Sequence, residues 1–381
     1  MAIEVLRGYR LLKDFAMISG GRCKWTFAVK DGEEYFIKQY LSPRYPTADS
    51  PGSEKTKQTK LRDCEIFENH QQRLRDEIGP RVSKGGNVVF TVDFFHEGTF
   101  YYKVTEKIDV SSLTPSEIAL LPLDARLLII LTILSALRVL HAANIVHGDL
   151  KPDNILIKQK SESNFVAKLI DFDDSYFAHE APDINDEEEL EDIVGTLDYY
   201  SPELGAYVRK DGSVKSSDLG LESDIFALGI IFSQYLTGKK PEFDAKKHTY
   251  AWQAALYGTA PVLPKVVDKA HKSGSHKIDT HALANVINLM FHKDPTERPS
   301  LNALIDNIKA IKNGSSTTMP LSVIVTPEPP TAPTITGKLV EKSKEKSTSG
   351  SSDAGTAADG TTPPTSKLII GRGFTKKSTD S

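Results

Sequence analysis

Three polar side chains of types that can transfer a phosphoryl group lie close together in residues 147–154, which have the sequence HGDLKPDN. In that chemistry a carboxylate accepts the proton of an attacking hydroxyl, an ammonium group neutralises the moving phosphoryl group, and an amide oxygen binds a magnesium ion. The matching residues are Asp149, Lys151 and Asn154. An apolar, helix-like segment precedes the run and the strand-like residues 155–157 follow it, so we expect one short loop to hold all three side chains.

This run resembles the HRDxxxxN catalytic loop of eukaryotic-type serine/threonine protein kinases. Further segments that resemble motifs of this family follow in the family's order, at residues 169–173 (LIDFD), 195–203 (GTLDYYSPE), 223–229 (SDIFALG) and 294–299 (DPTERP). Several long motifs in the correct order argue against a chance match. The resemblance extends over residues 9–312 and implies an ATP-dependent kinase similar to stand-alone bacterial members of the family.

The resemblance implies a role for each polar residue of the loop. Asp149 is the implied catalytic base, Lys151 the implied contact of the γ-phosphate, and Asn154 and Asp171 the implied ligands of Mg²⁺. The position of Lys151 after Asp149 is similar to that in serine/threonine kinases. The implied acceptors are therefore serine and threonine hydroxyls of protein substrates.

The later motifs imply supporting contacts. Asp224 is expected to accept backbone hydrogen bonds from the catalytic loop, and Arg298 to form a buried ion pair with Glu203. Phe172 is expected to pack beneath the helix of the smaller lobe.

Apolar and polar residues alternate in short segments near the N-terminus. Residues 9–15, 25–29 and 35–40 show this alternation, and turn signals separate them at 19–21 and 30–32. This pattern predicts antiparallel strands joined by hairpins, which suits the small lobe of a kinase.

The same resemblance implies a nucleotide site in this lobe. Gly20 and Gly21 would let the backbone lie close over the ATP phosphates, although the GxGxxG spacing is absent and a plain hairpin turn is an equal alternative. Lys38 stands where a strand lysine pairs with the α and β phosphates. Backbone groups at Glu106 and Ile108 are the implied contacts of the adenine ring, after a gatekeeper at Thr105.

A helix is predicted over residues 57–75, with an apolar stripe formed by Leu61, Cys64, Phe67 and Leu74. A kinase needs an acid on this helix to hold Lys38. The motif register suggests Asp63, and Glu65 is the rival candidate. The two acids lie two positions apart, on different helix faces, so only one can point at Lys38.

The sequence departs from the family pattern at two sites. Asp173 replaces the glycine of the DFG motif, which predicts either a less mobile backbone or an extra metal contact. Gly148 replaces the arginine that pairs with a phosphate on the activation loop, so we expect activity to be independent of phosphorylation there. The acidic residues within 183–192 are expected to form a solvated face.

Composition narrows the class of protein. The 381 residues have a net charge of −4, which argues against a nucleic-acid-binding protein. The cysteines, Cys23 and Cys64, are too few for a disulfide framework and fit a reducing compartment. The N-terminus lacks an apolar signal segment, and the apolar residues 127–140 are too short to span a membrane. We therefore expect a cytoplasmic protein that does not bind membranes.

Further patterns complete the predicted fold. Residues 88–92 and 101–105 predict two more strands, and the almost wholly apolar residues 127–141 predict a buried helix. The prediction is an α+β, two-lobed protein kinase fold with an antiparallel-sheet small lobe and a helical large lobe. Its parts are a small lobe for ATP binding (1–106), a large lobe with the catalytic loop, metal and substrate sites (107–312) and a disordered Ser/Thr/Pro-rich tail (313–381).

Two other functions are compatible with parts of the sequence. The HGD and DFD triplets at residues 147–149 and 171–173 resemble those of small-molecule phosphotransferases, which lack the segment at 195–203. The sparse glycine loop and the altered DFG motif suit a nucleotide-binding pseudokinase scaffold, but the retained catalytic residues oppose it. The sequence leaves the oligomeric state open.

Overall fold

A computed structural model describes residues 5–17, 23–83, 86–89, 91–108, 112–161, 164–182, 196–210, 212–267 and 277–315. Gly20, Gly21, the acidic run and the predicted disordered tail beyond residue 315 lie outside the described residues.

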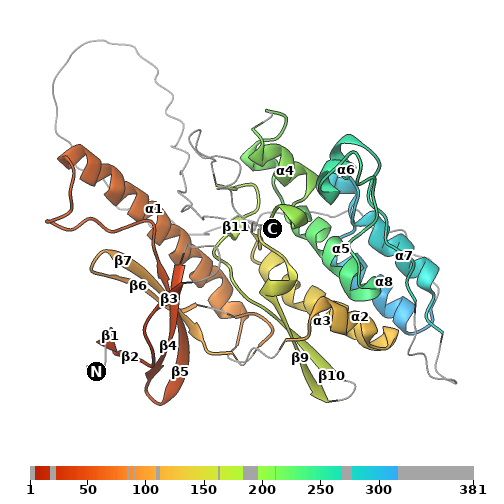
Figure 1. Cartoon of the computed structure of the whole chain (residues 1–381), viewed down its shortest axis with the longest axis horizontal. Helices are drawn as coiled ribbons and strands as arrows, with labels where there is room; N and C mark the ends of the chain where they lie inside the picture. Colours follow the sequence, from red (N-terminus) through yellow and green to blue (C-terminus); the bar gives the residue numbers. More distant parts are fainter. Residues whose placement is uncertain are drawn as a thin grey trace, which may run out of the picture.

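An antiparallel sheet makes up the N-terminal part of the molecule (Figure 1). Seven described strands form it, in the order β1-β2-β4-β5-β7-β6 with β3 paired to β4. They are β1 (Val5–Leu6), β2 (Tyr9–Leu11), β3 (Ala16–Met17), β4 (Cys23–Lys30), β5 (Glu33–Tyr40), β6 (Thr91–Glu97) and β7 (Phe100–Glu106). The register places Trp25 opposite Lys38, and Lys38 opposite Lys103, on the neighbouring strands β4, β5 and β7. These side chains therefore share one face of the sheet.

The long helix α1 (Glu54–Ile78) packs beside this sheet (Figure 1). The Ser53 hydroxyl caps its first turn by accepting a hydrogen bond from the backbone N–H of Thr56. Its buried side chains recur every three or four residues, at Cys64, Phe67, Gln71, Leu74 and Ile78. The predicted helix is confirmed, and it is longer than predicted at both ends.

The strand predicted at residues 88–92 is wrong in its position. The strand on the other side of β7 from β5 is β6 (Thr91–Glu97), whose Phe95 lies opposite Tyr102, so the prediction overlaps it only at residues 91–92. Val88 instead forms an isolated parallel bridge with Leu169. Val88 and Val89 are buried beside β10. Their apolar side chains fit burial there as well as pairing in the main sheet, so hydrophobicity alone does not distinguish the two positions.

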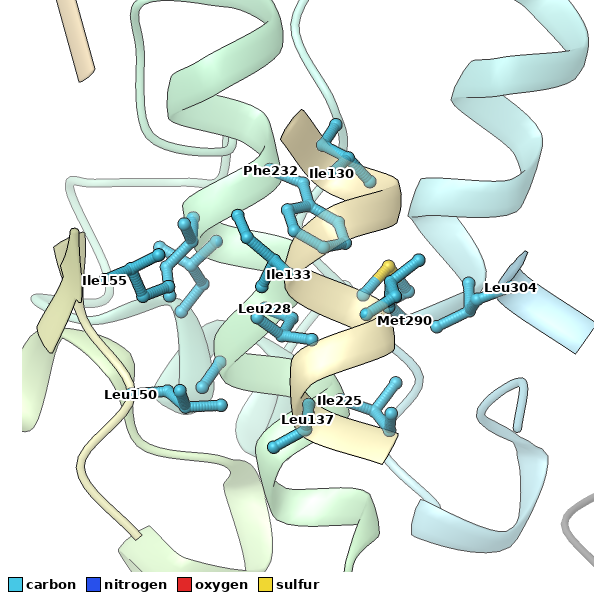
Figure 2. Packing of buried hydrophobic residues seen from close by; sticks show 14 of the residues in the cluster. Ile130, Ile133, Leu137, Leu150, Ile155, Ile225, Leu228, Phe232, Met290 and Leu304 are labelled. Atoms are coloured by element: carbon cyan, nitrogen blue, oxygen red, sulfur yellow. The ribbon is translucent and has the colours of Figure 1, made fainter. Parts of the chain in front are cut away.

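The C-terminal part of the molecule is helical. Its helices are α2 (Pro115–Leu120), α3 (Leu123–His141), α4 (Pro202–Val208), α5 (Glu222–Thr237), α6 (Ala251–Tyr257), α7 (Thr280–Leu289) and α8 (Leu301–Lys312). Helix α3 is buried on most sides, as its apolar sequence predicts. Figure 2 shows Ile133 and Leu137 of α3 packed among side chains of α5 and α8.

Two short antiparallel pairs hold the loops that follow α3. They are β9 (Ile155–Ser161) with β10 (Asn164–Leu169), and β8 (Ile145–Val146) with β11 (Tyr176–Phe177). Leu150 and Ile155 are almost fully buried and point into the helical core (Figure 2). The loop that carries Asp149 is therefore anchored by apolar side chains within it and directly after it.

The predicted α+β, two-lobed arrangement is confirmed, with a sheet followed by a helical part. The lobe boundaries at residues 106 and 312 stay predictions. In the described residues, no helix is both long and apolar enough to cross a membrane.

Candidate active site

The structure brings the three polar residues of the catalytic loop together. Lys151 Nζ donates to Asp149 Oδ2 at 2.6 Å. The side-chain amide of Asn154 donates to the same oxygen at 3.0 Å and to the Asp149 carbonyl at 2.8 Å. The Asp149 side chain is only 10% exposed, so these charge-assisted contacts hold its carboxylate in one orientation.

Thr196 contacts this carboxylate from a segment distant in sequence. Its backbone N–H donates to Asp149 Oδ1 at 3.1 Å, and Lys151 Nζ donates to its hydroxyl at 3.1 Å. This threonine lies within the segment at residues 195–203, and its sequence position alone indicates no role for it. Its contact depends on how the segment after residue 195 folds back, which local spacing does not reveal.

Asp224, at the start of α5, fixes the backbone of the catalytic loop. Its carboxylate accepts from the backbone N–H of His147 at 2.8 Å and from that of Gly148 at 3.3 Å. His141 Nε2 lies 2.9 Å from the same carboxylate. The predicted role of Asp224 is confirmed.

A buried ion pair supports the first turn of α4. Both guanidinium nitrogens Nη1 and Nη2 of Arg298 donate to Glu203, at 2.8 and 2.7 Å. Burial alone would raise the pKa of Glu203, but Arg298 more than offsets it and holds the pKa below its usual value. The predicted ion pair is confirmed.

Asp171 and Asn154 form an oxygen-rich edge that suits magnesium. The backbone N–H of Ile170 donates to the Asn154 carbonyl at 3.1 Å, which places Asp171 beside Asn154. The Asn154 amide nitrogen is used as a donor, so its amide oxygen is the atom that can bind a metal. Among the described residues, no cluster of three or more His, Cys, Asp or Glu side chains could hold a metal. One carboxylate and one amide fit Mg²⁺, which is usually shared between a few protein oxygens and substrate phosphates.

A cavity of about 350 Å³ lies between the sheet and β9, next to this edge. Lys38, Asp171 and Asp173 lie at one part of its wall, and Thr105, Glu106 and Ile108 at another. Lys168 Nζ pairs with the Glu106 carboxylate at 2.6 Å, which fixes that side chain. Predicted base-binding and phosphate-binding residues thus share one cavity, whereas Gly20 and Gly21 cannot be assigned to it.

Aromatic rings form a part of this cavity wall that the sequence analysis did not identify. Trp25 and Phe27 of β4 and Phe36 of β5 line it. The ring centroids of Trp25 and Phe36 are 5.8 Å apart in a stacked arrangement. The signal was the spacing of Trp25 and Phe27, two residues apart on one strand and thus on one face.

The prediction that Asp63 or Glu65 pairs with Lys38 is wrong. Lys38 Nζ pairs with Asp171 Oδ1 at 2.5 Å and with Asp173 Oδ2 at 2.9 Å. In the described part of the chain, neither Asp63 nor Glu65 pairs with it: Asp63 is half-buried and Glu65 is exposed. The orientation of α1 about its own axis directs Cys64 and Phe67 toward the core and directs these two acids away from Lys38.

The opposite charges in this cluster shift the pKa values of Lys38 and Asp173 in the direction that favours their ionised forms. Burial alone would lower the pKa of Lys38, but the Asp171 and Asp173 carboxylates raise it above its usual value. Burial alone would raise the pKa of Asp173, but Lys103 and Lys38 hold it far below its usual value. The Lys38 ammonium and the Asp173 carboxylate therefore stay ionised at neutral pH.

Phe172 packs as predicted. It is 5% exposed and belongs to the same buried cluster as Leu74 and Ile78 of α1. The segment that carries Asp171 and Asp173 is thereby attached to both parts of the molecule.

Comparisons with known proteins agree with this geometry. Residues 56–308 match the protein kinase domain family. Serine/threonine-protein kinase D of Synechocystis is 28% identical over 274 residues, which cover 71% of this chain and 49% of that protein. Calcium-dependent protein kinase 4 of Plasmodium berghei is 27% identical over 305 residues, covering 74% of this chain and 50% of that protein. A protein kinase and PP2C-like domain-containing protein of Arabidopsis thaliana is 27% identical over 245 residues, covering 60% of this chain and 34% of that protein. The chain thus spans half or less of the length of these relatives.

Proposed function

Since this chain belongs to the protein kinase domain family, we propose that it transfers the γ-phosphate of ATP to serine and threonine hydroxyls of protein substrates. The observation that carries the proposal is the set of contacts that orients Asp149. Lys151 and Asn154 hold one of its oxygens, and Thr196 holds the other. A buried carboxylate held in this way can accept a proton from an attacking hydroxyl in one defined direction.

Five polar residues have a part in the proposed reaction. Asp149 accepts the proton of the substrate hydroxyl, and Lys151 neutralises charge on the transferred phosphoryl group. Lys38 contacts the α and β phosphates. Asn154 and Asp171 hold Mg²⁺, which supplies charge neutralisation at the phosphates.

The base of the nucleotide is proposed to bind at the other part of the cavity. The Glu106 carboxylate is taken by Lys168, so backbone groups of Glu106 and Ile108 are the groups left to contact the adenine ring. The rings of Trp25 and Phe36 line this cavity and offer apolar surface that a base can contact. Coverage of the phosphates by Gly20 and Gly21 remains part of the proposal, outside the described residues.

Activity is proposed to be independent of phosphorylation of the activation loop. A Cβ atom at Gly148 would lie 2.4 Å from the carbonyl oxygen of Asp174, and Gly148 has φ +79°. Both features exclude an arginine there without a shift of the backbone. We therefore expect phosphatase treatment of the purified chain to leave its kcat unchanged, and a loss of activity would contradict this.

Transfer of labelled phosphate from ATP with Mg²⁺ tests the proposed function. The full chain is compared with Asp149→Asn, using the chain itself and a generic basic protein as acceptors. We expect label on serine or threonine that falls by at least about 100-fold in the variant, while ATP binding persists. ATP binding without transfer in the wild type would favour a pseudokinase, and transfer only to small molecules would favour a small-molecule phosphotransferase.

A further inference from the structure

Both acids that contact Lys38 come from the segment after β10. They are Asp171 and Asp173, at 2.5 and 2.9 Å from Nζ. The acids of α1 have other surroundings: Glu65 is exposed, and Glu68 accepts a hydrogen bond from the Tyr101 hydroxyl at 2.6 Å. In the described residues, α1 supplies no counter-ion to Lys38.

Asp173 is held by three donors from the sheet. Lys103 Nζ and the Tyr40 hydroxyl each donate to Oδ1 at 2.7 Å, and Lys38 Nζ donates to Oδ2. The side chain of Lys103 is only 7% exposed, and that of Asp173 is 20% exposed. A buried carboxylate with three donors on two oxygens has little freedom to rotate.

The sheet register explains why these donors meet. Lys38 on β5 and Lys103 on β7 are direct cross-strand neighbours, so both ammonium groups project from one face at one level. Two adjacent buried ammonium groups would repel each other without a shared anion. Asp173 lies between them and contacts both.

The two acids that contact Lys38 are not equivalent in the proposed reaction. Asp171 is the proposed Mg²⁺ ligand, and a carboxylate that binds the metal is less available to Lys38. Asp173 keeps its contacts to Lys103 and Tyr40, which belong to the sheet. It is therefore the acid that can hold Lys38 throughout the reaction.

We propose that Asp173 is the positioning residue for Lys38, that Lys103 holds Asp173 in place, and that no acid of α1 takes part. This inference rests on the proposed function, because it assigns Lys38 to the nucleotide phosphates. Its consequence is that the sheet and the segment after β10 set the position of the phosphate-binding lysine. Movement of α1 then has no direct effect on Lys38.

Asp173→Asn tests the role of the acid through separate measurements of kcat and nucleotide affinity. We expect kcat to fall roughly 10- to 100-fold, because Lys38 is misplaced by an ångström or more. The dissociation constant for ADP without metal is expected to change by less than about threefold, because loss of the carboxylate also removes repulsion of the phosphates. Equal losses of kcat and ADP affinity, with a lower Tm, would mark Asp173 as structural support and overturn the proposal.

Lys103→Met tests whether Lys103 keeps Asp173 in position, and Glu77→Gln on α1 is the control. Glu77 pairs with Arg81 at the surface, at 3.1 Å. Lys103→Met is expected to lower kcat with little change in ADP affinity, whereas Glu77→Gln leaves both unchanged. If Asp63→Asn or Glu65→Gln lowers kcat as much as Asp173→Asn does, α1 supplies the acid and the proposal fails.

A crystal structure of the full chain with ADP and Mg²⁺ decides the proposal without reference to activity. We expect the contact between Lys38 and Asp173 to persist. Asp173 bound to the metal, Lys38 paired with an acid of α1, or a chain that binds no ADP would each overturn it. A wild-type chain that binds ADP but transfers no phosphate would refute the proposed function alone, since these contacts would still be visible.

Discussion

Arg298 and Glu203 form a two-pronged ion pair in the helical part of the molecule, although they lie 95 positions apart. The Arg298 side chain is fully buried and that of Glu203 is 7% exposed. The same guanidinium also donates to the carbonyls of Glu222 and His292. The pair thus connects the first turn of α4 with the start of α5 and with the residues that precede α8.

Arg298→Met is expected to lower the free energy of unfolding by about 3–5 kcal/mol, because it leaves the Glu203 carboxylate buried without its partner. Urea denaturation measures this change. The control is Lys312→Met, which removes the more exposed contact of Lys312 with Asp124 and should change stability by less than about 1 kcal/mol. Similar losses in the two variants would contradict a special role for the buried pair.

Gly148→Ala is expected to destabilise the protein by about 2–5 kcal/mol, because a positive φ is combined with a backbone clash at Asp174. Gly32→Ala is the matched control. Gly32 has φ +81° but no atom within 4 Å of its added Cβ, so only about 1–2 kcal/mol should be lost there. Chemical denaturation of both variants gives the difference, and equal losses would show that the close approach of Asp174 is unimportant.

Protonation of the buried His70 ring should lower the free energy of unfolding at acidic pH. Its Nε2 lies 2.9 Å from the Ser175 carbonyl, and burial lowers its pKa from 6.5 to about 4. The folded state therefore favours the neutral ring, and this stability is present above pH 6.5 and is lost as the pH falls toward 4. Between pH 7.5 and 4, the wild type should lose on the order of 2–3 kcal/mol more stability than His70→Gln.

The exposed His281 provides the control for this measurement. His281→Gln should keep the pH dependence of the wild type in urea denaturation. A pH dependence in His70→Gln that equals that of the wild type would exclude the buried ring as its source.

Nucleotide binding should change the fluorescence of Trp25. The chain contains two tryptophans, and Trp252 is 2% exposed in α6, away from the cavity. In Trp252→Phe, titration with ADP should change the remaining emission until the site is saturated, because the base stacks near Trp25. In Trp25→Phe the emission of Trp252 should stay constant, and the reverse result would place the base elsewhere.

The loop at residues 147–154 is predictable because its polar residues are close in sequence. Asp149, Lys151 and Asn154 lie within six residues on one loop, so their side chains can meet without a long-range contact between them. Helix α1 and strands β4, β5 and β7 are predictable because the period of apolar residues is a local property. The strand placed at residues 88–92 fails for the same reason, since an apolar pair next to β10 has the same local pattern as a strand.

By itself, the sequence determined the order of motifs, the α+β class and the residue types available for phosphoryl transfer. Only the tertiary structure decided which acid meets Lys38. The contact between Lys38 and Asp173 joins residues 135 positions apart. It depends on the orientation of α1 about its axis, the register of β5 and β7 and the position of Asp173. Contacts of this kind depend on the packing of whole elements, which no short window of sequence contains.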